Sequence, residues 1–173
     1  MYTTEPFQIE GDDIILGIFG TSTFINAKKG EGREIRTAAI QQIVQVLRSI
    51  NPKLVYIIPS AGVSLHLTTI LDYLRIPFIM VSPSKGHFNR FNKKNKVLLK
   101  RAVQECKSLI VINNIQANML NYLKLEQLSE DFIIDRSDLI LSVYGSFKTS
   151  KEEKIHEKLN EIKKDVIFLN YSN

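Results

Sequence analysis

The sequence predicts one α/β domain of three layers, built on a mainly parallel sheet of five to six strands. Three observations predict this fold. Short apolar runs of strand length alternate with longer segments whose apolar residues recur at helical spacing, the pattern of a parallel sheet covered on both faces. The 173 residues, 44% hydrophobic and 24% charged, suit a single domain with a sizeable core. No internal repeat or low-complexity linker interrupts the chain, so 1–173 is predicted as one domain, with 1–12 as a short N-terminal extension.

The first half of the chain is expected to contain three strands and two helices. Each strand is an aliphatic run that ends at a glycine or a proline, and the first helix stops at Asn51-Pro52. Its apolar positions have helical spacing: Ile35, Ala39, Ile43, Leu47 and Ile50. The strands are expected at 14–19, 54–58 and 78–81, the last closing at Ser82-Pro83, and the second helix runs up to residue 74.

The second half continues the alternation. A helix is expected over about 91–106, with Val97, Ala102, Val103 and Cys106 on its inner side. Ser150 at the N-cap and Glu153 at N3 form a predicted capping box for the last helix, whose inner stripe is Ile155, Leu159 and Ile162. The remaining elements are strands at 109–112, 139–143 and 166–169 and a helix from 119 to about 129, with a second helical stretch through 132–133 as an alternative end.

The charge and the cysteine content limit the function classes. The net charge is +5, but segment 85–107 has eight Lys or Arg against one Glu, so this segment carries +7 and the rest of the chain −2. The protein is basic in one place only, which weakens a nucleic-acid interpretation based on pI alone. The single cysteine, Cys106, excludes an intramolecular disulfide and a cysteine-built metal cage, and we expect it in the core.

The ends and the hydropathy of the chain predict a cytoplasmic protein. No run of about 18 apolar residues occurs, so no contact with a membrane is expected. The first residues lack the basic and apolar regions of a signal peptide. Histidines 66, 87 and 156 are far apart and no metal-ligand spacing occurs, so we expect no metal site, with His66 at the surface and His156 solvated.

Three loops at strand ends predict a binding site. In open parallel sheets, the carboxyl ends of strands and the amino ends of helices meet at one edge, where free N–H groups favour anions. The loops consist of residues that let the backbone approach a phosphate or donate to it. They are Gly20-Thr21-Ser22, Ser60-Ala61-Gly62-Val63-Ser64, and Gly145-Ser146 extending to Thr149-Ser150. None is a Walker loop or a Gly-x-Gly-x-x-Gly fingerprint, and small residues also make ordinary turns.

These loop sequences carry a resemblance. Ile-Phe-Gly-Thr-Ser after the first strand, Ile-Pro-Ser-Ala-Gly-Val-Ser after the second and Ile-Pro-Phe-Ile-Met-Val-Ser-Pro in the third resemble the SLOG group of Rossmann-like nucleotide-binding proteins. That group includes DprA, the LOG phosphoribohydrolases and the YpsA-like proteins. Segments 91–95 and 135–144 are most similar to the YpsA-like branch, which usually has Trp at the position of Phe91. The resemblance covers about 14–164, and one glycine of the group is replaced by Ala61.

The resemblance implies a Rossmann-like domain that binds a nucleotide-type ligand, with no separate cofactor. Phe91 would stack on the base, and Arg90 or Lys93 would meet a phosphate or solvent. LOG enzymes end in Pro-Gly-Gly-x-Gly-Thr-x-x-Glu, and Thr149-x-x-Glu152 fits this pattern, whereas Lys148 replaces a glycine. Glu152 is therefore a candidate catalytic carboxylate for cleavage of an N-glycosidic bond, although carboxylates in a first helical turn also complement the helix dipole. Lys148 is a candidate phosphate ligand.

We rank three function hypotheses from these observations. A nucleotide-binding sensor or regulatory role comes first, and a nucleoside-monophosphate N-glycosidase second. The third is single-stranded DNA binding of the DprA kind through segment 85–107, where cations interleave with Phe88 and Phe91, although that spacing equally anchors a helix to the sheet. A homo-oligomer is compatible with the pattern, but no apolar stripe decides it.

Overall fold

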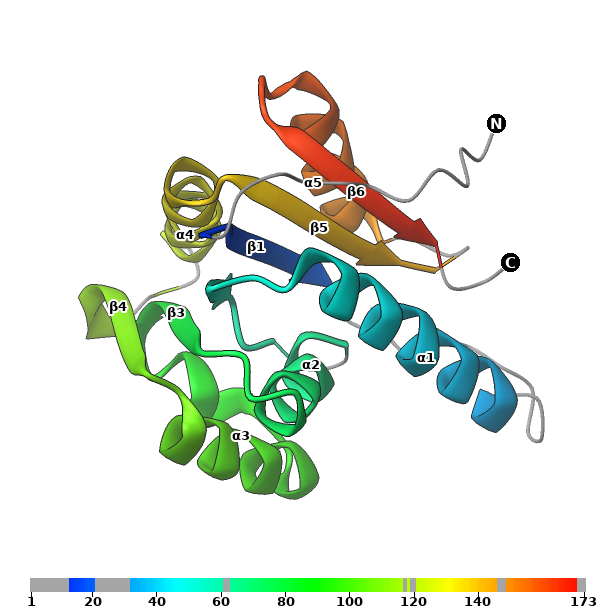
Figure 1. Cartoon of the computed structure of the whole chain (residues 1–173). Helices are drawn as coiled ribbons and strands as arrows, with labels where there is room; N and C mark the ends of the chain where they lie inside the picture. Colours follow the sequence, from blue (N-terminus) through cyan, green and yellow to red (C-terminus); the bar gives the residue numbers. More distant parts are fainter. Residues whose placement is uncertain are drawn as a thin grey trace.

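The protein folds into a six-stranded, all-parallel sheet between two layers of helices (Figure 1). The computed structural model describes residues 13–20, 32–60, 63–116, 118, 121–145 and 149–170. The strand order is β4-β3-β2-β1-β5-β6, which confirms the predicted Rossmann-like α/β class. The elements are β1 (Ile15–Gly20), α1 (Gly32–Ile50), β2 (Leu54–Ile57), α2 (Val63–Tyr73), β3 (Phe78–Lys85), the short 3₁₀ helix η1 (His87–Arg90), α3 (Lys93–Glu105), β4 (Ser108–Gln116), α4 (Tyr122–Arg136), β5 (Leu139–Tyr144), α5 (Ser150–Glu161) and β6 (Asp165–Asn170).

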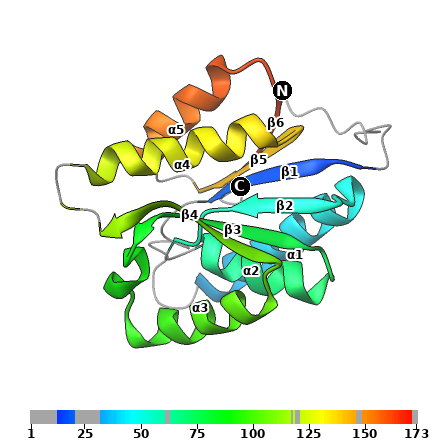
Figure 2. The ribbon, with the colours of Figure 1, turned by 90° about the vertical axis from the view of Figure 1, so that its left-hand side faces the viewer.

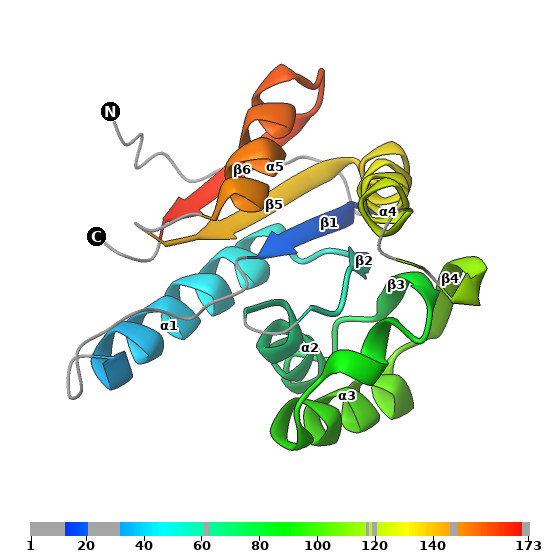
Figure 3. The same cartoon turned by 180° about the vertical axis from the view of Figure 1, so that it is seen from behind.

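The strand order divides the helices between the two faces. From β1 to β4 the chain moves in one direction across the sheet, and then it returns to place β5 on the other side of β1. Because parallel crossovers are right-handed, this reversal sends α1, α2 and α3 to one face and α4 and α5 to the opposite face. Figures 2 and 3 show this arrangement, with the sheet between the two groups. The reversal makes the carboxyl ends of β1 and β5 the topological switch point of the fold.

Each face of the sheet buries its own apolar cluster. The larger cluster lies under α1, α2 and α3 and contains strand residues such as Leu16, Ile18 and Val55. The smaller one lies under α4 and α5 around Phe19, Ile133 and Ile140. Gly17 lets α4 come close to the sheet, since a Cβ there would lie 2.7 Å from Ile133 Cγ2 and 2.6 Å from Ser137 Oγ.

The corner between α4 and β5 is fixed by backbone contacts. Asp138 exchanges two hydrogen bonds with Ile15: its Oδ2 accepts from the Ile15 N–H at 2.9 Å, and its own N–H donates to the Ile15 carbonyl at 2.8 Å. The Lys164 ammonium donates to the carbonyls of Ile134, Asp135 and Ser137 at the end of α4. These contacts hold α4 over β1 with its first half above the carboxyl edge of the sheet.

Several strand and helix predictions differ from the structure. The fourth strand, expected at 109–112, runs from Ser108 to Gln116, and the helix expected to end near 129 continues unbroken to Arg136. The third strand does not close at Ser82-Pro83 but runs to Lys85, because β2 ends opposite Met80 and beyond that point β3 pairs only with β4, where proline is tolerated. The inner side predicted for α3 is wrong for Val97 and Val103, which are 71% and 43% exposed. Ala102 is buried as predicted, and Leu99, three residues earlier on the same side of α3, is buried with it.

Three further predictions, on the cap of α5 and on the burial of His156 and Cys106, are only partly correct. The capping box of α5 lies one residue earlier than expected, with Thr149 at the N-cap and Glu152 at N3. His156 is half-buried rather than solvated, with its ring 4.5 Å from that of Phe168. Cys106 is half-buried and packs against the larger cluster, and burial raises the pKa of its thiol. Within the described ranges, no helix has the length and apolar character needed to cross a bilayer.

Candidate functional site

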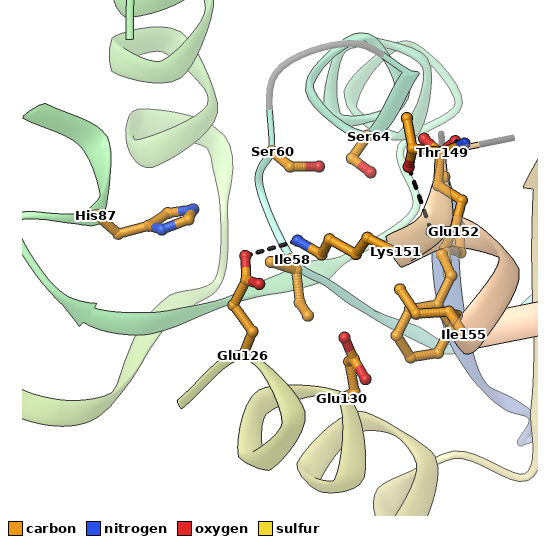
Figure 4. Close-up of a pocket in the computed structure, with 13 residues that line it drawn as sticks. Ile58, Ser60, Ser64, His87, Glu126, Glu130, Thr149, Lys151, Glu152 and Ile155 are labelled. Carbon is orange, nitrogen blue, oxygen red and sulfur yellow. Dashed lines mark hydrogen bonds and ion pairs between the residues drawn. The ribbon is translucent and has the colours of Figure 1, made fainter. Parts of the chain in front are cut away.

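A pocket lies at the switch point of the sheet, where the sequence predicts a ligand. The end of β1, the exit of β2, and the first turns of α2 and α5 form one side of it. η1 and the first half of α4 form the other side (Figure 4). The residues that line it are Ile18, Phe19, Gly20, Ile58, Ser60, Ser64, His87, Glu126, Glu130, Thr149, Lys151, Glu152 and Ile155. We call the first side, with Gly20, Ser60, Ser64 and Thr149, the hydroxyl wall, and the second, with His87, Glu126 and Glu130, the acceptor wall.

The hydroxyl wall is built around the amino end of α2. Gly20 approaches this helix so closely that a Cβ would lie 3.0 Å from Ser64 Oγ and 3.3 Å from Ser64 N. The first turn of α2 contains no acidic residue, so no carboxylate of that turn offsets the positive end of its dipole. Free N–H groups and a serine hydroxyl at such a position suit an anion.

The amino end of α5 differs from that of α2. The Thr149 N–H donates to Glu152 Oε2 at 2.7 Å, and the Glu152 N–H donates to Thr149 Oγ1 at 3.3 Å. This capping box uses two of the N–H groups that an anion would need, and the first turn of α5 also carries Glu152 and Glu153. The α2 end is therefore the better phosphate position of the two. The Glu152 carboxylate lines the pocket, but it already has a structural role.

The acceptor wall carries two buried carboxyl groups. Glu126 and Glu130 are one turn apart on the buried face of α4 and are only 8% and 7% exposed. Glu126 Oε1 lies 2.6 Å from Lys151 Nζ, and Figure 4 shows the Lys151 side chain crossing the cavity from α5 to reach it. Burial raises the pKa of Glu130, while the charges of Lys158 and Lys151 lower it. Lys158 Nζ is 3.7 Å from Glu130 Oε2 and 2.5 Å from Asp131 Oδ1.

His87 closes the acceptor wall and belongs to an aromatic cluster. Its ring lies 5.4 Å from the ring of Phe88, 6.0 Å from that of Phe91, and stacks on Tyr122 at 6.0 Å. The Tyr122 hydroxyl lies 3.0 Å from His87 Nδ1. Burial lowers the pKa of His87, which favours the neutral ring at pH 7; the nearby Pro59 carbonyl and the charge of Glu126 act in the opposite direction.

The structure brings some of the predicted site residues together and separates others. Gly20, Ser60, Ser64, Thr149 and Glu152 line one pocket. Val63 is buried in the first turn of α2, and Gly145 is buried after β5. Thr21, Ser22, Ala61, Gly62, Ser146 and Lys148 lie outside the described residues.

Arg90 and Phe91 lie beside the pocket rather than in its described lining. The Arg90 guanidinium is over the Tyr122 ring, 5.0 Å from its centroid, and borders a second, smaller cavity. Phe91 is half-buried against His87 and Phe88. The aromatic residues of segment 85–107 therefore anchor η1, as their three-residue spacing allowed. The lysines of α3 point outward, and its Arg101 forms an ion pair with Asp72 at 3.0 Å.

Sequence reasoning missed His87, Glu126, Glu130 and Lys151 as site residues. A signal for the two glutamates exists, since they lie at i and i+4 next to the apolar positions Leu125 and Ile133, on the inward side of the helix. His87 has no comparable signal, because only the tertiary structure brings η1 opposite α4. Among the described residues, no group of three or more His, Cys, Asp or Glu has the arrangement of a metal site.

Comparison with known proteins adds no identification. No protein-family model matches the chain, and a search of curated proteins found no match. The resemblance to the SLOG group stays a prediction based on its short motifs.

Proposed function

We propose that this pocket binds a nucleotide or nucleotide-derived ligand through its phosphate, in a sensor or regulatory role. The proposal is based on the geometry at the amino end of α2, in the hydroxyl wall. Gly20 packs closely against Ser64 there, at the switch point where α/β sheets bind ligands, and no acidic residue occupies the first turn. The acceptor wall opposite offers carboxylate and imidazole groups to the hydroxyls and amines of a nucleoside.

Calorimetric titration with AMP, GMP, CMP and UMP tests the proposal, with adenosine as the ligand that lacks the phosphate. We expect Ser64→Ala to weaken binding of the preferred nucleotide about tenfold, the loss of one hydrogen bond to a charged group. Ser49→Ala is the matched control, because Ser49 is exposed on α1 and its hydroxyl bonds to the Gln45 carbonyl. Equal affinity for adenosine and AMP, or no binding of any nucleotide at millimolar concentration, would contradict the proposal.

The buried carboxyl groups favour N-glycosidase activity as a second candidate function. Water would bond through its oxygen to C1′ of a nucleoside monophosphate while the C1′–N bond breaks. A protonated Glu130, favoured by its raised pKa, would give its proton to the leaving base, and a second carboxylate would take the proton of the water. The products are ribose 5-phosphate and the free base.

Chromatography of the released base measures this activity. We expect Glu130→Gln to lower turnover at least about a hundredfold, the usual contribution of a general acid. Glu152→Gln separates the two carboxyl groups, because a glutamine oxygen can still accept from the Thr149 N–H. Unchanged turnover in Glu152→Gln would remove Glu152 from the chemistry. Absence of base release with every nucleotide that binds would remove the enzyme candidate and leave the binding role.

A further inference from the structure

A second cavity, which we call the basic cavity, lies beside the pocket described above. It is formed by the end of β3, by η1 and by the start of α4, and its lining includes Ser84, Lys85, His87, Asn89, Arg90 and Tyr122. His87 lines both cavities and is their shared wall, and Figure 4 shows its ring beside the first pocket. The described lining of the basic cavity contains two cations and no carboxylate, whereas three glutamates line the first pocket.

The two cations of the basic cavity are not neutralised by the protein. No ion pair among the described residues includes Lys85 or Arg90, although other Lys and Arg side chains are paired. The Arg90 guanidinium lies over the Tyr122 ring, 5.0 Å from its centroid, and this contact holds it at the cavity. Cations without a counter-ion that line one cavity attract the same anion.

The backbone is irregular where it forms the basic cavity. The register of β3 against β4 shifts between Ser84 and Lys85. Gly86 then adopts a φ of 81°, a conformation that residues with a Cβ rarely adopt. Irregularities of this kind in a strand often re-aim side chains next to functional sites. Here they turn the chain from β3 into η1, so that Lys85 of the strand and Arg90 of η1 line the same cavity.

We propose that the basic cavity is an anion site separate from the hydroxyl wall, and that it takes a phosphate group between Lys85 and Arg90. Two cations match the charge of a phosphate dianion; the guanidinium can donate two parallel hydrogen bonds and the ammonium supplies a point charge. Ser84 and Asn89 add a hydroxyl and an amide to the same lining. The phosphate group is either a free ion or the second phosphate of a ligand that extends past His87 from the first pocket. The inference goes beyond the proposed function and does not depend on it.

Calorimetric titration with inorganic phosphate tests the site. We expect the wild type to bind two phosphate ions per chain, and the double variant Lys85→Met/Arg90→Met to lose at least about tenfold in affinity at one of them, the loss of hydrogen bonds to a charged group. The control is Lys93→Met/Lys94→Met, which removes the same charge from exposed positions of α3 outside both linings. Equal weakening in the two double variants, or unchanged binding in the first, would overturn the inference. Lys85→Met alone serves if the double variant is unstable, because Lys85 is exposed.

Ser64→Ala separates this inference from the proposed function. We expect it to weaken only the phosphate ion at the hydroxyl wall. Phosphate binding that responds to Ser64→Ala alone would overturn the inference and leave the proposed function standing. Binding that responds to the Lys85 and Arg90 variants alone would support the inference and refute the phosphate position of the proposed function.

Two nucleotides identify the source of the phosphate group. If one ligand occupies both cavities, Arg90→Met weakens the binding of adenosine 3′,5′-bisphosphate and leaves that of AMP unchanged. If the basic cavity takes a free ion, Arg90→Met changes neither nucleotide affinity, and phosphate still binds to the protein saturated with AMP. A protein saturated with AMP that binds no phosphate, together with an unchanged bisphosphate affinity in Arg90→Met, would overturn the inference.

Discussion

The two walls of the pocket differ in what builds them. The hydroxyl wall consists of backbone and short side chains at the ends of β1 and β2 and at the starts of α2 and α5. The acceptor wall consists of longer side chains on η1 and α4, which follow β3 and β4 in the chain and are brought over the pocket when the chain returns to β5. Lys151 joins the walls, since it starts in α5 and ends on Glu126. The hydroxyl wall is therefore built locally, by strand ends and helix starts, whereas the acceptor wall depends on how α4 packs on the sheet.

The largest expected effect is a loss of stability on substitution of two glycines of β1, Gly17 next to α4 and Gly20 next to α2. Gly17→Ala would place a Cβ 2.6–2.9 Å from side-chain atoms of Ile133, Ser137 and Ile140, so α4 must move, and we expect the free energy of unfolding to fall by about 1–3 kcal/mol. Gly20→Ala meets its nearest atom, the rotatable Ser64 hydroxyl, at 3.0 Å, so we expect a smaller loss.

Urea unfolding measures the stability of both glycine variants. Titration with phosphate shows which of the two substitutions disturbs the hydroxyl wall. Gly20→Ala should weaken phosphate binding more than Gly17→Ala does, because Gly20 touches the α2 end directly. Equal losses of stability in the two variants would show that α4 is not seated on β1 through Gly17.

A moderate effect is expected where Lys151 joins the walls. Lys151→Met removes a cation from the pocket and leaves Glu126, whose side chain is 11% exposed, without its ion pair, so phosphate should bind about threefold more weakly. Glu126→Gln should have the opposite sign, since it removes a negative charge and frees Lys151 for the anion. Calorimetry gives both affinities. Lys154→Met, an exposed lysine of α5 outside the pocket lining, is the control, and the same direction of change in both pocket variants would refute this electrostatic account.

The smallest effect expected is the pH dependence of stability, to which the acceptor wall makes two contributions of opposite sign. Because the pKa of His87 lies below 6.5 in the fold, the unfolded chain takes up the proton first, and stability is lost as pH falls below about 6.5. Because the pKa of Glu130 lies above 4.5 in the fold, the native state takes up the proton first, and its contribution grows as pH falls toward 4.5. The ionisable groups around His87 stay the same in every variant compared; they are Tyr122, Glu126, Lys151 and Arg90.

Unfolding free energies of three proteins between pH 7.5 and pH 4.5 separate the two contributions. His87→Phe should lose less stability than the wild type as pH falls from 7.5 to 5.5. Glu130→Gln should lose more than the wild type over the acidic part of the range. Parallel curves for all three proteins would show that neither group is coupled to folding in the way its burial requires.

Much of the fold was predictable because it is written in local patterns. Uninterrupted aliphatic runs identified the strands, and helical spacing identified α1 and α5. The errors have physical reasons that lie outside the local sequence. Pro83 has no N–H and interrupts a strand only where a neighbouring strand needs a donor at that position; beyond Met80, β3 pairs with β4 alone and continues past the proline. Val97 and Val103 are apolar, yet they are exposed, because the packing of α3 against the rest of the molecule buries the side that carries Leu99 and Ala102.

The alternation of strands and helices and the small residues of the hydroxyl wall can be read from the sequence alone, because both depend on residues adjacent in the chain. Where Glu126 and Glu130 lie relative to those loops, and that Tyr122 of α4 contacts His87 of η1, depends on the tertiary structure. The reason is the return of the chain from β4 to β5: α4 lies in this crossover and packs against β3, β1 and β4, and no local pattern specifies where a crossover of that length packs on the sheet.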